Sequence, residues 1–334
     1  MSRCRVIAVV NQKGGVGKTT TAVSLAACFG ASERSTLLID LDPQGNASSG
    51  FGVSNPPHQV YDVLIGRMAI KEAVLETELS SLDLLPAGPD LVGAEIELAV
   101  EDDRAQRLAV AVAEARNNYE LILIDCPPSL GILTLNALTA ADSILIPLQC
   151  EYYALEGLAR LMETRDLVRD QLNPRLELEG IVLTMVDMRN NLSRQVEAEV
   201  RGHFGDKVYR TRIPRNIRLS EAPSHGKPIL LYDIHSRGAV TYLKLAEEIL
   251  ERIANQSSSH PDSLLHSASS SHPASSLHPA SSLHPASSSH PASSSHPAST
   301  SHPASPQPPT PSTSTAPLDE NASQHPNERG TPNE

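Results

Sequence analysis

The sequence contains few aromatic side chains: no tryptophan, three phenylalanines and seven tyrosines among 334 residues. The last of them is Tyr242, so the final quarter of the chain has none. A segment without aromatic residues and with few large apolar ones cannot offset the cost of ordering its backbone, about 1–2 kcal/mol per residue. We therefore expect a folded domain at residues 1–256 and a disordered tail, rich in Ser, Pro, Ala and His, at residues 257–334.

The predicted tail repeats a six-residue unit, Leu-His-Pro-Ala-Ser-Ser or Ser-His-Pro-Ala-Ser-Ser, with a histidine at every sixth position from 260 to 302. Proline in these units disfavours a helix and favours an extended chain. Regularly spaced histidines suit metal binding or a response to pH, since free imidazole titrates near pH ~6.5. The alternative is a repeat expansion that a solvated tail tolerates.

Cysteine is also scarce, and long apolar runs are missing. The four cysteines form no CxxC pair, and nothing resembles a secretory signal; they are Cys4, Cys28, Cys126 and Cys150. We expect reduced thiols in or near the core of a cytoplasmic protein. No apolar run reaches the ~18–20 residues that span a bilayer, so no membrane attachment is expected.

Positive charge is in deficit, with a formal net charge of −12. The tail holds five acidic residues and one arginine, which leaves −8 on the predicted domain. An acidic domain does not bind nucleic acid by bulk charge, so any DNA binding requires a local basic patch.

Short apolar runs alternate with helical patterns along the domain. Strands are expected at residues 6–10, 37–40, 82–85, 121–125, 143–148 and 181–186, and helices at residues 22–30, 91–116, 193–204 and 239–254. Unalternating apolar strands are typical of a parallel sheet that is covered on both faces. The pattern predicts a doubly wound α/β fold, with a mostly parallel sheet and a ligand at the carboxyl ends of the strands.

The strongest motif lies between the first strand and the first helix and reads Lys-Gly-Gly-Val-Gly-Lys-Thr. A triphosphate requires backbone N–H groups that point inward, close approach without side chains, and a helix N-terminus behind them. The glycines permit the approach, Lys18 reaches the β- and γ-phosphates, and the Thr19 hydroxyl suits Mg²⁺. The predicted nucleotide-binding residues are Lys13, Gly14, Gly15, Val16, Gly17, Lys18, Thr19 and Thr20.

This loop departs from the common Walker A pattern, because Gln12 stands where the first glycine is expected and Lys13 precedes the glycine pair. It resembles the deviant Walker A motif of the ParA/MinD family of P-loop NTPases. The resemblance implies that Lys13 reaches the nucleotide of a second subunit, so that ATP is bound in a sandwich homodimer.

Two carboxylates, Asp40 and Asp42, follow the second predicted strand, and Asp125 ends another. Carboxylates at strand ends beside a phosphate loop are placed to bind the waters of Mg²⁺ and to orient an attacking water. The segments around them resemble the second nucleotide motif and the Walker B motif of the same family. The resemblance implies that Asp42 acts in hydrolysis, that Asp40 supports the metal region, and that Asp125 holds Mg²⁺ through water.

The expected cofactors are therefore ATP and Mg²⁺. Catalysis is assigned to Lys13, Lys18 and Asp42, and the metal to Thr19, Asp42 and Asp125. The family resemblance further implies slow hydrolysis that serves as a timer, with Pro214 and Asn216 on the adenine side.

Basic residues are concentrated between Arg189 and Lys227, where nine face four acidic ones. Such a stretch in an acidic protein is either a phosphate-facing patch or a solvated charged surface. Residues 149–157 and 213–229 are very similar to chromosomal Soj-type ParA proteins, and the resemblance covers about residues 4–254. It implies non-specific binding to double-stranded DNA through Arg189, Arg215 and Arg218, association with the nucleoid, and a ParB-like protein that stimulates hydrolysis.

Other members of the superfamily remain as alternatives. MinD-type ATPases end in a basic amphipathic membrane helix, which His-Pro-Ala-Ser repeats cannot form. Nitrogenase-type iron proteins need cysteines that share a cluster, and Cys126 has no evident partner. Tyrosine kinases with this loop usually have a tyrosine-rich C-terminus. A regulatory or polar-localisation scaffold ATPase is the main alternative, and the intact Asp42 argues against lost hydrolysis.

Overall fold

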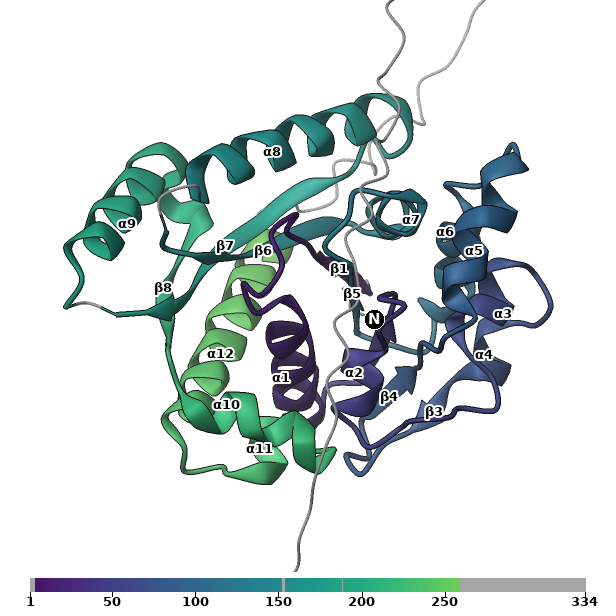
Figure 1. Ribbon diagram of the computed structural model, residues 1–334, viewed down its shortest axis with the longest axis horizontal. Coiled ribbons are helices and arrows are strands. Elements are labelled where there is room, and N and C mark those ends of the chain that lie inside the picture. The colour runs from purple at the N-terminus through teal and green to yellow at the C-terminus, as the bar shows by residue number, and fades with distance from the viewer. Residues whose placement is uncertain (1–3, 152–153, 188, 259–334) are drawn as a thin grey trace, which may run out of the picture. The chain divides into compact units, whose positions relative to one another are not determined.

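The computed structural model describes residues 4–151, 154–187 and 189–258 (Figure 1). The predicted tail lies outside the described residues from residue 259 onward, so the expectations about its repeats stay predictions. The described part contains an eight-stranded sheet in the order β3-β4-β2-β5-β1-β6-β7-β8. Its strands are β1 (Arg5–Val9), β2 (Thr36–Asp40), β3 (Leu75–Glu76), β4 (Leu82–Leu85), β5 (Leu121–Asp125), β6 (Ser143–Gln149), β7 (Glu177–Val186) and β8 (Val208–Pro214).

The sheet is parallel except for the short strand β3, which pairs antiparallel with β4. All six predicted strands are confirmed. Every residue of β2 and β5 is buried. Alternate side chains enter two separate apolar cores: Leu37 and Ile39 lie in one, and Leu38 lies in the other. A strand that serves two cores needs apolar residues at successive positions, which is why these strands show no alternation.

Helices cover both faces of the sheet, which confirms the doubly wound α/β fold. The longer ones are α1 (Lys18–Ala31), α5 (Leu91–Glu97), α6 (Arg107–Ala115), α7 (Ile132–Ala140), α8 (Ala154–Gln171), α9 (Asn191–Phe204) and α12 (Arg237–Ser258). Short ones are α2 (Asn46–Ser49), α3 (Val60–Leu64), α4 (Ile70–Ala73), α10 (Ile217–Glu221) and α11 (Ile229–Tyr232). Helices α1 and α12 share one core, where the hydroxyls of Thr21 and Tyr242 lie 3.0 Å apart. Helices α3 and α5 to α9 contribute to the other core.

The prediction of one helix over residues 91–116 was wrong. The chain leaves α5 through a 3₁₀ turn at Leu98–Val100 and starts α6 only at Arg107. The intervening residues are mostly charged and exposed, so they have no apolar face to bury. The side chain of Asn136 in α7 is buried here: it accepts a hydrogen bond from the Leu108 amide at 3.1 Å and donates to the Arg104 carbonyl at 2.6 Å. This tertiary contact takes the place of the helical hydrogen bonds.

All four cysteines are buried and none forms a disulfide, as expected. Among the residues that the structure describes, no helix has both the length and the apolar character that a membrane span requires.

Strand β8 lies at the end of the sheet and is irregular. Its register against β7 jumps from Ile181–Val208 to Leu183–Arg212, so β8 carries extra residues there. The amides of Arg210 and Thr211 instead donate to the Glu248 carboxylate of α12, at 2.9 and 3.0 Å. Glu248 is 5% exposed and also accepts from Arg252 at 2.9 Å. Burial alone would raise the pKa of Glu248, but these hydrogen bonds hold it below its ordinary value of 4.5.

We predict that Glu248→Ala lowers the free energy of unfolding by about 2–4 kcal/mol at neutral pH, because two amides lose a charged acceptor. Glu248→Gln keeps one acceptor oxygen and serves as the milder control. A group with a depressed pKa stabilises the fold above its unfolded pKa and loses that effect as the pH falls. The difference in the free energy of unfolding between the parent and the alanine variant should therefore shrink below pH 4.5. Denaturant unfolding from pH 7 to pH 3 measures it, and equal stability at pH 7 would contradict the role of Glu248.

Candidate functional site

Three segments with polar side chains meet at the carboxyl edge of the sheet. The phosphate loop follows β1, Asp40 ends β2 and Asp42 comes just after it, and Asp125 ends β5, which lies between these two strands. In the register, Asp125 is the partner of both Asp40 and Val9. The structure thus brings together the predicted phosphate-binding and carboxylate residues.

The loop at residues 11–17 has the open form that a phosphate group requires. Gly15 and Gly17 have φ values of +74° and +90°, which side-chain-bearing residues rarely adopt. A Cβ added at Gly14, Gly15 or Gly17 would meet no atom within 4 Å, so the space in front of the loop is free. Helix α1 begins directly behind it at Lys18 and presents its unpaired amides.

Two side chains that the sequence analysis did not identify anchor this loop. Asn11 donates to the Pro147 carbonyl at 2.8 Å and accepts from the Lys13 amide at 2.9 Å, which ties the loop to β6. Thr184 of β7 donates to the Val16 carbonyl at 2.8 Å. Thr184 lies far from the loop in the sequence, and asparagine is a common residue type. No local sequence pattern therefore identifies either residue as an anchor. They hold the loop open from two sides.

Lys18 is a buried cation at the bottom of the loop, with 7% of its surface exposed. Its ammonium lies 3.4 Å from the Lys13 carbonyl. Burial lowers the pKa of Lys18, and the charges of Asp125 and Asp42 partly offset that effect. A desolvated ammonium without an ion-pair partner within 4.0 Å in the described chain is placed to attract a polyanion.

Asp125 is the opposite case, a fully buried carboxylate that accepts no hydrogen bond of ordinary geometry in the described structure, although the Thr19 hydroxyl lies close enough to lower its pKa. Burial, and next the charge of Asp40, raise the pKa of Asp125 well above its ordinary range. Buried carboxylates normally have partners, so one without them marks a site that a cation or its bound water completes.

Asp40 and Asp42 differ in their surroundings. Asp40 accepts from the amide and the hydroxyl of Ser48, both at 2.7 Å, and from the Asp42 amide at 3.2 Å. Burial raises the pKa of Asp40 to about 6, and these hydrogen bonds limit the rise. Asp42 accepts from the Gln44 amide at 3.0 Å and is 6% exposed. Asp40 therefore shapes the turn at residues 41–48 that positions Asp42.

The donor set fits Mg²⁺ held largely through water and phosphate oxygens. Mg²⁺ prefers oxygen ligands and keeps several of its waters. Thr19, at the start of α1, and the unpartnered Asp125 supply such oxygens. In the described residues no three His, Cys, Asp or Glu side chains are arranged to chelate an ion directly. The protein alone does not form a closed cage, and the site leaves room for a nucleotide to contribute ligands.

Lys13 forms an ion pair with Glu151, which lies just beyond β6. Both side chains are 45% exposed. Glu151 was not assigned a role from the sequence, although it lies in the segment 149–157 that carries the family resemblance. In a single chain Lys13 is thus held by a carboxylate at the surface.

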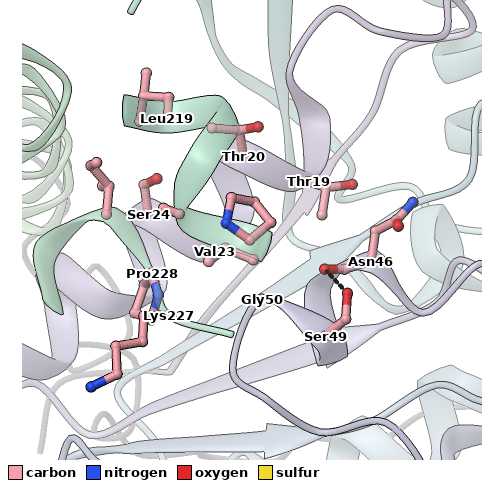
Figure 2. A pocket seen from close by; sticks show the side chains of 13 residues that line it. Thr19, Thr20, Val23, Ser24, Asn46, Ser49, Gly50, Leu219, Lys227 and Pro228 are labelled. Atoms are coloured by element: carbon pink, nitrogen blue, oxygen red, sulfur yellow. Dashed lines mark hydrogen bonds between the residues drawn. The ribbon is translucent and has the colours of Figure 1, made fainter. Parts of the chain in front are cut away.

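A pocket of about 240 Å³ lies beside the start of α1 (Figure 2). Its lining combines the first turns of α1 with α2 and with the segment from α10 to α11: Thr19, Thr20, Val23, Ser24, Asn46, Ser49, Gly50, Leu219, Ala222, Pro223, Lys227, Pro228 and Ile229. Pro214 and Asn216, predicted on the adenine side, are not among them. Pro214 ends β8, and Asn216 caps α10 by accepting from the Arg218 amide at 2.8 Å.

The three predicted DNA-contacting arginines are exposed but fall into two groups. Arg189 and Arg215 both lie near Asp187: the hydrogen bonds and charge of Arg189, and next the charge of Arg215, lower the pKa of Asp187 to about 2. Arg218 in α10 instead forms ion pairs with Glu221 at 2.9 Å and Asp233 at 3.6 Å.

Other acids from outside the basic stretch also reach into it, with Glu248 and Glu251 beside Arg210, and Glu78 beside Lys227. The local charge excess is therefore smaller in the fold than along the sequence.

Comparison with known proteins agrees with this geometry. A family model described as an AAA domain matches residues 4–178. The chain is 56% identical over 250 residues to the chromosome partitioning protein ParA of Myxococcus xanthus, covering 74% of this chain and 88% of that one. It is 55% identical over 247 residues to the sporulation initiation inhibitor protein Soj of Bacillus subtilis, covering 73% and 98%.

Among solved structures, cobyrinic acid a,c-diamide synthase of Mycobacterium smegmatis with a bound ATP analogue and magnesium is similar, with a TM-score of 0.66 and 37% identity. The match covers 76% of this chain and 97% of that one.

We predict that Asp125→Asn raises stability in the absence of nucleotide, by about 1–3 kcal/mol at pH 8, because a buried carboxylate without partners is replaced by a neutral group. A folded-state pKa above the ordinary value of 3.8 means that the parent loses stability as the pH rises through the folded pKa. The advantage of the variant should therefore grow from pH 5 to pH 8 in thermal unfolding. Asp42→Asn keeps an oxygen that accepts from the Gln44 amide and removes a carboxylate that already has this partner, so it is the control that should gain little.

Proposed function

The chain belongs to the ParA/Soj family of chromosome-partitioning proteins, and we propose that it is an ATP-driven switch that binds DNA as a homodimer and releases it after hydrolysis. The observation that carries this proposal is the carboxyl edge of the sheet, where an open glycine loop, the buried Lys18 and the unpartnered Asp125 lie together. A polyanion with a bound cation would satisfy all three.

The loop amides and Lys18 would hold the β- and γ-phosphates, and Thr20 would lie next to the remaining phosphate. The pocket beside α1 would then take part of the nucleoside, since its lining starts at Thr19 and Thr20 and is partly apolar. Pro214 and Asn216 stay predictions for the adenine side. A nucleotide bound in this way touches α1, α2 and the α10–α11 segment at once.

Mg²⁺ would be held by the Thr19 hydroxyl and, through water, by Asp125 and Asp42. When bound, it neutralises charge on the phosphates during transfer. The related synthase named above was solved with an ATP analogue and magnesium, which supports this cofactor pair. Asp125 supplies negative charge at the closed end of the site, and its raised pKa would fall once a cation lies beside it.

Asp42 would orient the attacking water. It is nearly buried, its carboxylate is fixed by the Gln44 amide, and the turn that carries it is closed by Asp40 and Ser48. A fixed carboxylate can accept a proton from a water in line with the γ-phosphate. Because the chain contributes few other groups at this position, we expect slow hydrolysis that acts as a timer.

Dimerisation would engage Lys13. In the single chain its ammonium pairs with Glu151, and both side chains are half exposed. An exposed ion pair contributes only about 0–1 kcal/mol, so a triphosphate on a second subunit readily displaces Glu151. Lys13 would then neutralise phosphate charge in trans, which makes ATP itself the link between two copies.

DNA binding would use Arg189, Arg215 and Arg218, all on the exposed surface. Since the domain is acidic overall, two copies in one dimer are needed to present enough positive charge to the DNA backbone. The proposal places the protein on the nucleoid in the cytoplasm, with a ParB-like protein stimulating hydrolysis.

We predict a distinct defect for each nucleotide-site variant. Lys18→Ala should abolish binding of ATP, because the phosphates lose their buried cation. Lys13→Ala should bind ATP as the parent does yet stay monomeric. Asp42→Ala should dimerise on ATP and hydrolyse it about 100-fold or more slowly, the loss expected for a positioned base. Calorimetry, light scattering and phosphate release separate the three, and a Lys13→Ala protein that dimerises normally would contradict the role of that lysine.

We predict that the parent binds non-specific duplex DNA with ATP but not with ADP or without nucleotide, and that the affinity falls steeply between 50 and about 200 mM salt. Arg215→Glu should weaken this binding, whereas Lys71→Glu, the same charge change on the exposed helix α4, should not. Fluorescence anisotropy with labelled DNA is the measurement. If no nucleotide state binds DNA, the alternative of a regulatory scaffold ATPase gains support.

A further inference from the structure

A second concave surface lies far along the chain from the nucleotide site, between strand β8 and helix α12. These two elements pack side by side (Figure 1). The groove has a volume of about 430 Å³ and a short apolar base formed by Val186, Pro214 and Val240. Its remaining lining is polar: Arg210, Thr211, Arg212, Arg237, Thr241 and Lys244. Four of the nine lining residues are basic and none is acidic. We refer to it as the β8–α12 groove.

Two of the four basic residues have no ion-pair partner within 4.0 Å in the described part of the chain. Arg237 and Lys244 are exposed and lie seven residues apart on α12, which is about two turns and about 10 Å along one side of the helix. In the described part of the chain neither has a carboxylate within 4.0 Å, whereas most other arginines near them do. Their charges are thus offered to the groove.

The other two are held in place by acids behind the groove. Arg212 pairs with the buried Glu197 at 2.6 Å, and Arg210 lies 3.5 Å from Glu248. Glu197 and Glu248 are each shared with a further arginine, Arg201 and Arg252 respectively. Glu197 serves two guanidinium groups, whereas Arg210 also has Glu251 at 3.9 Å, so the excess positive charge of the groove comes from Arg212, Arg237 and Lys244. Arg210 is 81% exposed despite its contact.

An acidic border limits the surface on one side. Glu247, Glu248 and Glu251 line a neighbouring hollow together with Arg210, Thr211 and Lys244, so Lys244 lies between the groove and this acidic border. In the other direction the groove continues toward basic residues: Asp187 and Arg189 lie shortly after Val186, and Arg215 follows Pro214. The β8–α12 groove therefore joins the surface where Arg189 and Arg215 already lie together, and it extends that surface along α12.

We propose that the β8–α12 groove binds the phosphate backbone of duplex DNA, with Arg237 and Lys244 as its main contacts. The inference rests on the proposed function and assigns that function a larger DNA-binding surface than the three predicted arginines provide. The charge is complementary, and the shape is an open trough without the glycine cradle that encloses a nucleotide phosphate. Arg237 and Lys244 lie about 10 Å apart along α12, so each can meet a different phosphate of the same DNA strand.

This placement also gives Arg218 a smaller part. Its guanidinium forms ion pairs with Glu221 and Asp233, while Arg237 and Lys244 have no carboxylate within 4.0 Å in the described residues. Along a DNA strand that follows Arg189, Arg215, Arg237 and Lys244, Arg189 is the one with an ion-pair partner, Asp187 at 2.8 Å. Every contact of this kind goes to phosphate, so the binding has no sequence preference of its own.

The test is a double variant, Arg237→Glu with Lys244→Glu, against a matched double control, Lys71→Glu with Arg160→Glu. Both change the net charge equally, and the control residues are exposed on α4 and α8. Binding of a labelled 24-base-pair duplex is followed by anisotropy with ATP at several salt concentrations. The groove variant should bind at least tenfold more weakly, with a salt slope lower by about 2, since each lost phosphate contact removes about 1. The control should bind within about twofold of the parent.

Loss of folding can be distinguished from loss of DNA binding. Arg237 is the first residue of α12, where a glutamate is favoured by the helix dipole, and thermal unfolding checks the variant directly. Arg237→Gln with Lys244→Gln, which removes charge without reversing it, should show an intermediate loss.

If the parent binds DNA on ATP and the groove variant binds like the control, the groove assignment is overturned and the proposed function stands. If the parent binds no DNA in any nucleotide state, both fall.

Discussion

The carboxylate of Asp125 lies at the end of a central strand, without solvent and without a hydrogen bond of ordinary geometry in the described structure. Burying such a group is unfavourable, and the residues at this edge of the sheet surround it. Lys18 supplies a desolvated positive charge nearby, the glycine loop leaves open space, and Asp40, which accepts from Ser48, adds a second negative charge beside Asp125. These buried charges therefore favour a polyanion that comes with a cation, which the proposed ATP and Mg²⁺ would supply.

Much of this edge could be predicted from the sequence, because the relevant signals are local. The run at residues 6–10, the glycine loop and α1 are contiguous, and parallel strands place their carboxyl ends together. What could not be predicted depends on distant residues. Asn11 and Thr184 hold the loop through β6 and β7, and Glu151 pairs with Lys13 across 138 positions. The break in the predicted helix at residues 91–116 has the same cause, since Asn136 of another helix stabilises the new start.

The positively charged surface was the feature least predictable from the sequence. The excess of basic residues between Arg189 and Lys227 is reduced in the fold by acids from β7, α11 and α12 and their connections. Conversely, Arg237 and Lys244 lie outside that stretch and become part of the basic surface only because α12 packs against β8. A linear window counts neighbours in sequence, whereas the potential that a phosphate experiences depends on neighbours in space.

The carboxylate of Glu248 has a consequence for how copies of this protein can meet. Strand β8 ends the sheet, and an open strand edge offers a template on which another chain can add by backbone pairing, the route to swapped and fibrous assemblies. Glu248 occupies two of the amides that such pairing would need, and the irregular register bends the strand there. Pairing through β8 is therefore disfavoured, so the proposed dimer would be held by side chains and bound nucleotide and would come apart when that nucleotide is hydrolysed.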